Sequence, residues 1–454
     1  MVMEPINPAT GEAEEVYQEL SEDQLEMALN ASHQAFADWS QRSFANRRQI
    51  LQQAAALLRE KTDELGHLIT REMGKPIREA RGEVEKCAWV CDFYAEKGEQ
   101  LLAPHSAESD ASRSYVRYAP LGTVLAIMPW NFPFWQVFRA AAPSLMAGNT
   151  MLLKHASNVP GCAARIEGLL DEAGLPVGAF QNLALSSRRV EGVIDDPRVH
   201  GVTLTGSETA GRKVAASAGA ALKKTVLELG GSDPFIVLED ADLDEAARVA
   251  ATARTINSGQ SCIAAKRFLV VASVADDFLE RFRAHLEGLH TGDPMDEDTA
   301  IGPQARGDLR DELHRQVQDS IKAGARLLLG GEPTPGPGFF YPVTLLDGVT
   351  EGMPVAEEET FGPVAPVMRV ADEDEAVAVA NRSRYGLGGA VWSSDRERAE
   401  AVGRRLEVGA VFINGMVKSD PRLPFGGVKA SGYGRELGAF GIREFTNIQT
   451  VWIG

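Results

Sequence analysis

Cysteine is scarce in this sequence, with only four among 454 residues: Cys87, Cys91, Cys162 and Cys262. So few thiols cannot form a disulfide framework for a chain of this length, which favours reduced thiols in a reducing compartment. Cys87 and Cys91 are four residues apart in a helical pattern, so they lie on one helix face and do not form a CxxC redox or zinc pair. The opening residues also lack a basic segment followed by an apolar core, which favours a cytoplasmic protein.

Positive charge is also in short supply, since 46 Lys and Arg face 64 Asp and Glu and give a net charge of -18. Such a surface repels phosphate backbones and anionic headgroups, which argues against nucleic-acid and membrane partners. No window approaches the roughly 20 apolar residues of a bilayer span. His285 and His290 are five residues apart, about 140° around a helix, so they do not form an HExxH pair and we expect no metal site.

Periodicity predicts an α/β protein. Helical spacing covers residues 23–39, 45–71 and 79–102, and strand-like segments follow at 114–119 and 124–128. From about residue 150 to 229 strands and helices alternate, which implies a parallel sheet covered on both faces.

A second α/β stretch begins after residue 230. Its strand candidates are residues 267–271, 367–370, 389–392 and 410–413, and the tail ends in the apolar, strand-like residues 449–453. The sequence therefore predicts two α/β units and a leftover strand segment.

Cys262 is the first candidate for chemistry. It lies between small residues in SGQSCIAAKRF, just after a glycine and next to the start of a helix or strand. Such a cysteine is exposed enough to react and close enough to backbone N–H groups to be ionised. The alternative is a buried cysteine that acts as a small hydrophobic side chain.

Two further polar residues stand in unusual surroundings. Glu228 lies at the end of an apolar strand before two glycines, where loss of hydration would raise its pKa and let it accept a proton from water. Asn131 lies in PWNFP, where two prolines stiffen the backbone and hold its amide ready for an oxyanion. The alternatives are a strand-end glutamate capped by the following backbone amides, and an asparagine that only forms a turn.

Seven motifs that occur in a fixed order indicate which known proteins the sequence resembles. They are PWNFP, LLKHAS, TLTGSETAG, LELGGSDP, GQSC, EETFGP and PFGGVKASGYGRE. Over essentially its whole length the sequence resembles the aldehyde dehydrogenase superfamily. Within it, the segments TREMGKPI, IMPWNFPFWQVFR, LKHASNV and FINGMVKSDPRLPFGG are most similar to the bacterial succinate-semialdehyde dehydrogenases.

The resemblance implies an aldehyde dehydrogenase-like fold with a Rossmann-type cofactor domain, an α/β catalytic domain and a small β oligomerisation flap. The cofactor domain would comprise residues 1–110 and 123–229, and the catalytic domain residues 230–431. The flap would combine residues 111–122 with 445–454, while residues 432–444 return to the cofactor domain. Exposed edge strands of such a flap pair across subunits, so a homo-oligomer is expected, a dimer or a tetramer.

The resemblance also implies the roles of the three candidates. Cys262 would attack the aldehyde, and Asn131 would stabilise the oxyanion together with the Cys262 backbone N–H. After hydride transfer to the nicotinamide, Glu228 would activate the water that hydrolyses the thioester. The implied reaction is an NADP-preferring oxidation of succinate semialdehyde to succinate.

The implied cofactor site combines a strand-to-helix turn with motif residues from elsewhere in the chain. Its members are Trp130, Lys154, Ser157, Thr205, Gly206, Ser207, Gly211, Leu229, Glu359 and Phe361. Lys154 would hold the adenosine ribose, Glu359 the nicotinamide ribose, and Phe361 would pack near the ring. Lys429 and Glu436 lie in equally recognisable motifs, for which structural support is the alternative role.

The substrate side would be formed by Arg139, Trp135 and Ser419. A semialdehyde of a dicarboxylic acid carries a carboxylate, which requires a cation in a partly dry place. Arg139 follows Asn131 by eight residues on a predicted helix, and Lys418 and Arg422 flank Ser419. The alternative for Arg139 is a salt bridge.

Three other functions can be weighed against this one. A CoA-acylating enzyme shares the fold and the cysteine but does not need Glu228. A dehydrogenase of another semialdehyde or of an aliphatic aldehyde would keep every catalytic residue. A structural protein on the same fold would tolerate the loss of Cys262 or Glu228, and both are present.

Position 157 predicts the cofactor preference. Family members that prefer NAD often place a glutamate there, which binds the ribose 2′-OH and repels a 2′-phosphate. Ser157 is neutral and, with Lys154, can bind the phosphate, so we expect NADP to be preferred and NAD to be used less well. Ser157→Glu should shift the ratio of kcat/KM for NADP and NAD toward NAD, and an unchanged ratio would refute the assignment.

Overall fold

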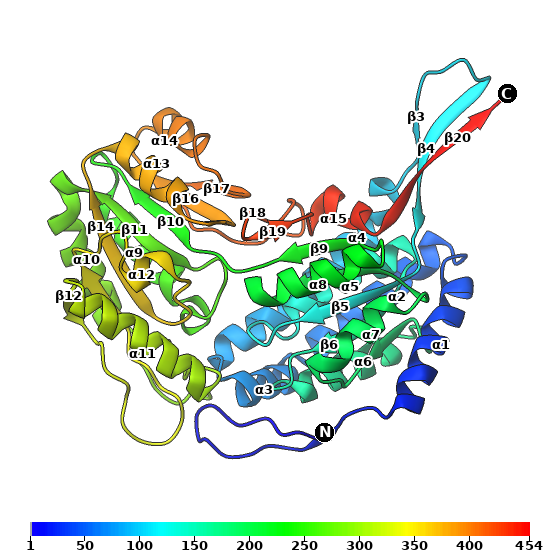
Figure 1. The fold of residues 1–454 in the computed structure, drawn as a ribbon, viewed down its shortest axis with the longest axis horizontal. Helices are drawn as coiled ribbons and strands as arrows, with labels where there is room; N and C mark the ends of the chain where they lie inside the picture. Colours follow the sequence, from blue (N-terminus) through cyan, green and yellow to red (C-terminus); the bar gives the residue numbers. More distant parts are fainter. Residues whose placement is uncertain (1) are drawn as a thin grey trace.

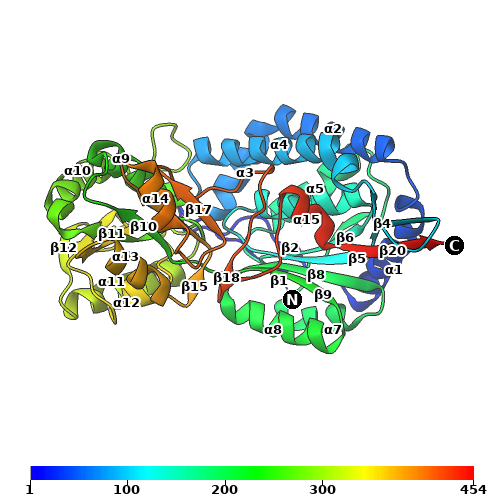
Figure 2. The same cartoon turned by 90° about the horizontal axis from the view of Figure 1, so that it is seen from above.

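A computed structural model describes residues 2–454, and its central feature is two separate sheets. The first has six strands in the order β19-β9-β8-β5-β6-β7. Its strands are β5 (Thr123–Met128), β6 (Thr150–His155), β7 (Phe180–Asn182), β8 (Val199–Thr205), β9 (Lys224–Glu228) and β19 (Gly432–Tyr433). All neighbours are parallel except β19, which pairs antiparallel with β9. Figure 2 shows helices on both faces of this sheet, α2 to α5 on one and α7 and α8 on the other.

The second sheet has seven strands in the order β12-β13-β14-β11-β10-β16-β17. They are β10 (Asp233–Val237), β11 (Ala265–Val271), β12 (Arg326–Leu329), β13 (Thr344–Asp347), β14 (Val364–Val370), β16 (Gly388–Trp392) and β17 (Ala410–Ile413). Only the edge strand β12 is antiparallel to its neighbour. Helices α9 and α10 pack on one face and α11, α13 and α14 on the other. The predicted α/β class and the parallel sheets are confirmed.

The helices surround these sheets and are named in chain order. They are α1 (Glu22–Trp39), α2 (Phe44–Glu60), α3 (Thr62–Met73), α4 (Ile77–Leu101), α5 (Trp135–Ala147), α6 (Pro160–Glu172), α7 (Val190–Asp195), α8 (Glu208–Ala220), α9 (Leu243–Thr255), α10 (Ala275–Glu287), α11 (Gly307–Lys322), α12 (Pro354–Glu357), α13 (Glu373–Arg382), α14 (Arg396–Gly403) and α15 (Gly438–Glu444). Short strand pairs also form: β1 (Val2–Met3) with β2 (Tyr17–Gln18), and β15 (Tyr385–Gly386) with β18 (Val428–Lys429).

One helix predicted over residues 45–71 is wrong, because the chain breaks between α2 and α3 at Lys61. The φ and ψ of Lys61 are -102° and 16°, outside the helical region. Thr62 directs its hydroxyl back to the carbonyls of Leu58 and Arg59, at 3.0 and 2.9 Å. Such local bonds compete with helix continuation, while the apolar spacing on both sides stays helical.

A three-stranded antiparallel sheet projects from the body, as Figure 1 shows. It consists of β3 (His105–Ser106), β4 (Arg113–Pro120) and β20 (Thr446–Ile453). β4 and β20 pair over eight residues, from Thr446 opposite Pro120 to Ile453 opposite Arg113. We call these three strands the flap. β20 exposes Ile448, Trp452 and Ile453, with 64%, 55% and 43% of their surface accessible.

A buried ion pair fixes the start of α5, the helix that carries Trp135 and Arg139. Lys75 and Glu83 bind each other with their side chains fully withdrawn from solvent. The second carboxylate oxygen of Glu83 accepts the backbone N–H groups of Phe134 and Trp135, at 2.8 and 2.9 Å. Glu83 therefore neutralises Lys75 and caps α5, where the helix dipole favours a negative charge.

None of the helices within residues 2–454 is long and apolar enough to cross a membrane.

Replacing Lys75 by Met should destabilise the protein strongly, because Glu83 would remain buried without its counter-charge. We expect a loss of about 3 kcal/mol or more in the free energy of unfolding, measured by urea denaturation. Lys97→Met is the matched control, since Lys97 pairs with Glu96 on the exposed surface of α4 and should cost about 0.5 kcal/mol or less. Equal losses in the two variants would contradict this account.

Candidate active site

Cys262 follows a strained turn. Asn257, Ser258 and Gly259 have φ angles of 55°, 54° and 77°, a left-handed conformation that costs energy for the first two. Glu79 on α4 accepts the Asn257 N–H at 2.6 Å, and Ser258 accepts the N–H of Gly302 at 2.9 Å. Neighbouring segments therefore hold the turn in a conformation that its sequence alone would not adopt.

The turn is tied directly to the segment that carries Asn131. The Asn257 amide donates to the backbone carbonyls of Asn131 and Gln260, at 2.7 and 2.9 Å. The Asn131 amide donates one N–H to the same Gln260 carbonyl, at 3.0 Å. Because an amide carries two N–H groups, the second one of Asn131 is available for another acceptor.

Gly259 fits against the loop of Gly362, on the segment that also carries Glu359 and Phe361. A Cβ atom at Gly259 would lie 2.2 Å from the carbonyl carbon and oxygen of Gly362, so no side chain can be accommodated. Lys266 adds a second connection: its ammonium donates to the Cys262 carbonyl at 2.7 Å and lies 3.4 Å from the Glu359 carboxylate. Glu359 also accepts the N–H of Gly231 at 3.0 Å.

Cys262 is only partly exposed, while the other three cysteines are buried. Burial raises the pKa of the Cys262 thiol to about 12, although the charges of Lys266 and Arg139 act in the opposite direction. The prediction that Cys87 and Cys91 are packed in a helix is confirmed, since both are fully buried in α4.

Glu228 ends β9 and is 2% exposed. Neither oxygen of its carboxylate has a hydrogen-bond partner within the described residues 2–454. Burial and the nearby Glu436 raise the pKa of Glu228 well above its ordinary value, against the opposing charges of Arg139 and Arg435. A negative charge on Glu228 would in turn raise the pKa of Cys262, so the two groups share one electrostatic environment.

Arg139 is 1% exposed and forms an ion pair with Glu436. Its guanidinium also donates to the Thr205 hydroxyl at 3.2 Å and lies 4.8 Å from the centre of the Phe425 ring. The salt bridge weighed as the alternative for Arg139 is therefore present. Burial raises the pKa of Glu436, and Arg139 counteracts this effect.

Lys429 is occupied by the protein's own groups. Its ammonium donates to the Asn381 carbonyl at 2.7 Å and pairs with Glu407 at 2.5 Å. These contacts are those of a residue that supports the local structure.

The predicted strand-to-helix turn is present between β8 and α8. Thr205 ends β8, and Ser207 caps α8 by accepting the N–H of Ala210 at 3.3 Å. Gly206 donates its N–H to the Glu228 carbonyl at 3.0 Å, which links the turn to the end of β9. Gly211 leaves room for Leu229, whose methyl groups would lie 2.6 Å from an added Cβ.

A cavity of about 850 Å³ lies at the end of β6 and is lined by Trp130, Lys154, Ser157 and Arg188 among others. Burial lowers the pKa of Lys154. Trp130 meets Phe361 edge to face, with 5.7 Å between ring centres. The structure thus brings together predicted cofactor residues from three distant segments.

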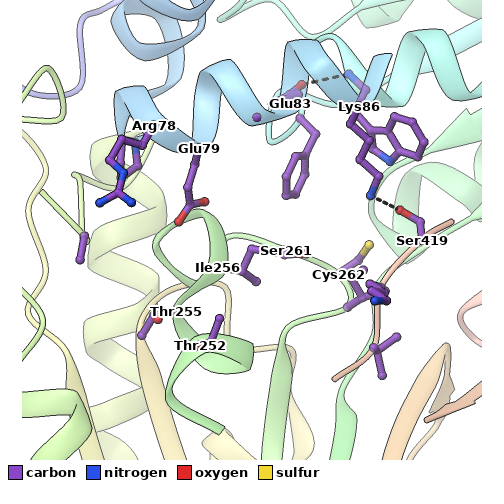
Figure 3. Close-up of a pocket in the computed structure, with 18 of the residues that line it drawn as sticks. Arg78, Glu79, Glu83, Lys86, Thr252, Thr255, Ile256, Ser261, Cys262 and Ser419 are labelled. Carbon is purple, nitrogen blue, oxygen red and sulfur yellow. Dashed lines mark hydrogen bonds between the residues drawn. The ribbon is translucent and has the colours of Figure 1, made fainter. Parts of the chain in front are cut away.

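A second cavity of about 770 Å³ opens on Cys262. The predicted substrate residues Trp135, Arg139 and Ser419 all line it. Figure 3 shows Lys86 reaching from α4 toward Ser419, with the sulfur of Cys262 below them. The Lys86 ammonium donates to the Ser419 hydroxyl at 2.7 Å and lies 4.3 Å from the centre of the Trp135 ring.

Several cations that line these cavities were not predicted from the sequence, among them Lys86 and Arg188. Lys86 is one of many polar residues on an amphipathic helix, where side chains usually face solvent. Arg188 could have been noticed as a cation in SSRRV, directly after a predicted strand. Within residues 2–454, no group of three or more His, Cys, Asp or Glu side chains could hold a metal ion.

The raised pKa of Cys262 predicts how the free protein reacts with iodoacetamide. Because only the thiolate reacts, the alkylation rate should rise about tenfold per pH unit from pH 7 to 9 without a plateau. One equivalent should be incorporated per chain, since the other three cysteines are buried, and Cys262→Ala should abolish labelling. Rapid labelling that levels off near pH 7 would contradict a raised pKa; the measurement is mass spectrometry of timed samples.

Comparisons with known proteins agree with this geometry. Residues 1–451 match the sequence model of the family described as "Aldehyde dehydrogenase family". The chain is 51% identical over 453 residues to a probable succinate-semialdehyde dehydrogenase [NADP(+)] of Synechocystis, and 50% identical over 456 residues to succinate-semialdehyde dehydrogenase [NADP(+)] 1 of Mycobacterium tuberculosis, with 100% of each chain covered.

Among solved structures, succinic semialdehyde dehydrogenase from Streptococcus pyogenes, in complex with NADP+, superimposes with a TM-score of 0.97 at 40% identity, over 99% of both chains. The family match spans nearly every residue, and about half of the residues are identical in the relatives. The chain therefore belongs to the aldehyde dehydrogenase family.

Proposed function

We propose that this protein oxidises succinate semialdehyde to succinate with NADP as the preferred hydride acceptor. The main support for the proposal is the cavity in front of Cys262. Its walls contain cationic and hydroxyl side chains that are partly or fully buried. A substrate with an aldehyde at one end and a carboxylate at the other matches those two features. The half-identical relatives named for this activity support the same assignment.

In the proposed mechanism Cys262 is the nucleophile and forms a thioester with the substrate carbon. Arg139 and Lys266 both lower the pKa of the Cys262 thiol, so their charges favour the reactive thiolate. The free N–H of the Asn131 amide and the Cys262 backbone N–H are proposed to stabilise the oxygen of the tetrahedral intermediate. NADP, held by the residues of the cavity at β6, would supply the acceptor for the hydride that leaves the aldehyde carbon.

Glu228 is proposed to act as the general base in thioester hydrolysis. Its buried carboxylate has a raised pKa, so it takes a proton from water more readily than an exposed glutamate would. Neither carboxylate oxygen has a hydrogen-bond partner within residues 2–454, so each can accept a hydrogen bond from that water. Hydrolysis by this route distinguishes the proposal from transfer of the acyl group to CoA.

The residues around the cavity at β6 fit NADP. Lys154 and Arg188 supply positive charge, and Ser157 supplies a hydroxyl group without a carboxylate that would repel a 2′-phosphate. The α8 N-terminus and the turn Thr205–Gly211 are proposed to face the pyrophosphate, while Glu359 and Phe361 would contact the nicotinamide half. In this proposal, residues 1–110 and 123–229 bind the cofactor and residues 230–431 carry out catalysis.

The substrate carboxylate is proposed to lie near Arg139 and Ser419, with Trp135 forming an apolar wall. The flap is proposed to join two copies of the chain. Its β20 exposes three large apolar side chains that a second copy would cover.

Glu228→Gln should separate the two halves of the reaction. With succinate semialdehyde and NADP, we expect a burst of about one equivalent of NADPH per site, followed by turnover slowed about 100-fold or more. The reason is that the thioester still forms but its hydrolysis loses the base. Stopped-flow absorbance at the NADPH band measures both phases.

Cys262→Ala is the control for this experiment and should show neither the burst nor turnover. A Glu228→Gln protein with wild-type steady-state turnover would show that Glu228 is not the base. Wild-type protein that oxidises butanal as efficiently as succinate semialdehyde would contradict the proposed substrate.

A further inference from the structure

The cavity in front of Cys262 is lined by a cation, Lys86, that has no carboxylate within ion-pair distance among residues 2–454. Lys86 is half-buried, and its ammonium contacts the Ser419 hydroxyl and the Trp135 ring. It forms no ion pair with any of the residues 2–454. A partly dehydrated ammonium without a carboxylate partner is unfavourable, and a bound anion would compensate for this cost.

Arg139 differs from Lys86 in this respect, because Glu436 already balances its charge. Arg139 is also almost completely enclosed, with one N–H on Thr205 and its plane against Phe425. A carboxylate that bound Arg139 alone would therefore meet little net positive charge.

The other cations on the cavity wall are less suited to bind a substrate carboxylate. Arg78 and Lys418 are exposed, and Figure 3 shows Arg78 at the opposite end of the cavity from Cys262. Arg248 pairs with Glu245 on the surface. Lys86, by contrast, points into the part of the cavity that holds Cys262 and Ser419.

The donors around Lys86 suit a carboxylate. An ammonium has three N–H groups, of which one is used by Ser419, and the Ser419 hydroxyl keeps its own hydrogen because it accepts that bond. An anion at this point can therefore receive N–H groups from Lys86 and the O–H of Ser419 together.

We propose that Lys86, with Ser419, binds the substrate carboxylate and selects semialdehydes with an anionic end over uncharged aldehydes. This inference rests on the proposed function and adds to it the residue that determines specificity. Lys86 acts on the non-reacting end of the substrate, so it affects substrate binding and selection without taking part in bond making at Cys262.

The ionisation of Lys86 allows an independent test of the proposal. Burial, followed by the nearby charge of Arg139, lowers the pKa of Lys86 to about 8. The groups that face it are Glu83 and Cys87 on its own helix, Arg139 on α5, and Asp420 beside Ser419. Lys86 is charged below its pKa and loses its charge as the pH rises through about 8, so selectivity should fall between pH 7 and 9. Ionisation of Cys262 or Glu228 affects both substrates and cancels in their ratio.

The test compares succinate semialdehyde with butanal, which has the same four carbons without the carboxylate. In Lys86→Gln we expect kcat/KM for succinate semialdehyde to fall about 10- to 100-fold, mainly through KM, while butanal changes less than about threefold. Lys97→Gln, on the exposed face of the same helix, should change neither value. Equal losses on both aldehydes, or no loss on either, would overturn the proposal.

Lys86→Arg provides the second variant. It keeps the positive charge at all these pH values, so it should retain most of the selectivity and lose its dependence on pH. A Lys86→Arg enzyme whose selectivity still falls between pH 7 and 9 overturns the assignment even if Lys86→Gln does not fold. A wild-type enzyme without preference for the semialdehyde refutes the proposed substrate, whereas a preference that persists in Lys86→Gln refutes only the role of Lys86.

Discussion

One face of helix α4 positions the walls of the cavity in front of Cys262. Glu79, Glu83 and Lys86 follow each other at spacings of four and three residues, so they lie on the same side of the helix. Glu79 holds the turn before Cys262, Glu83 caps α5, and Lys86 binds Ser419 near the C-terminal end of the chain. Three segments that are far apart in sequence thus take their positions from a single rigid element.

Three charged groups near Cys262 are almost completely withdrawn from water. Glu228, Glu436 and Arg139 are each at most 5% exposed, and two of the three are carboxylates. Burial raises the pKa of each carboxylate despite the opposing charge of Arg139. Burial and the neighbouring carboxylate thus hold the pKa of Glu228 well above its ordinary value, so this buried glutamate keeps a proton more readily than an exposed one.

The sequence predicted the α/β class, the parallel sheets and the family because these depend on local patterns. Apolar runs define the central strands, and short motifs mark the turns at Cys262 and Glu228. Shorter or less regular elements were missed, among them β10, which begins with Asp233 and Pro234, the edge strand β12 and its neighbour β13. The break at Lys61 was missed because the apolar spacing continues across it.

Side-chain partners across long sequence distances could not be predicted. Arg139 and Glu436 are almost 300 residues apart, and only the folded chain brings them together. Lys86 contacts Ser419 across 333 residues, and on an isolated helix it is indistinguishable from the exposed Lys97. The sequence predicted that Arg139, Trp135 and Ser419 line one substrate cavity, but it did not reveal that Lys86 lies among them.

The close approach of Gly259 to Gly362 has a consequence for how such an enzyme can diversify. The loop of Cys262 and the loop of Glu359 and Phe361 touch backbone to backbone, with no space for an intervening side chain. They therefore form one mechanical unit in which a displacement of either loop displaces the other. New substrate preferences are then most readily acquired on the opposite wall, at α4, α5 and the segment of Ser419, where side chains can be exchanged while the distance between Cys262 and the loop of Phe361 is preserved.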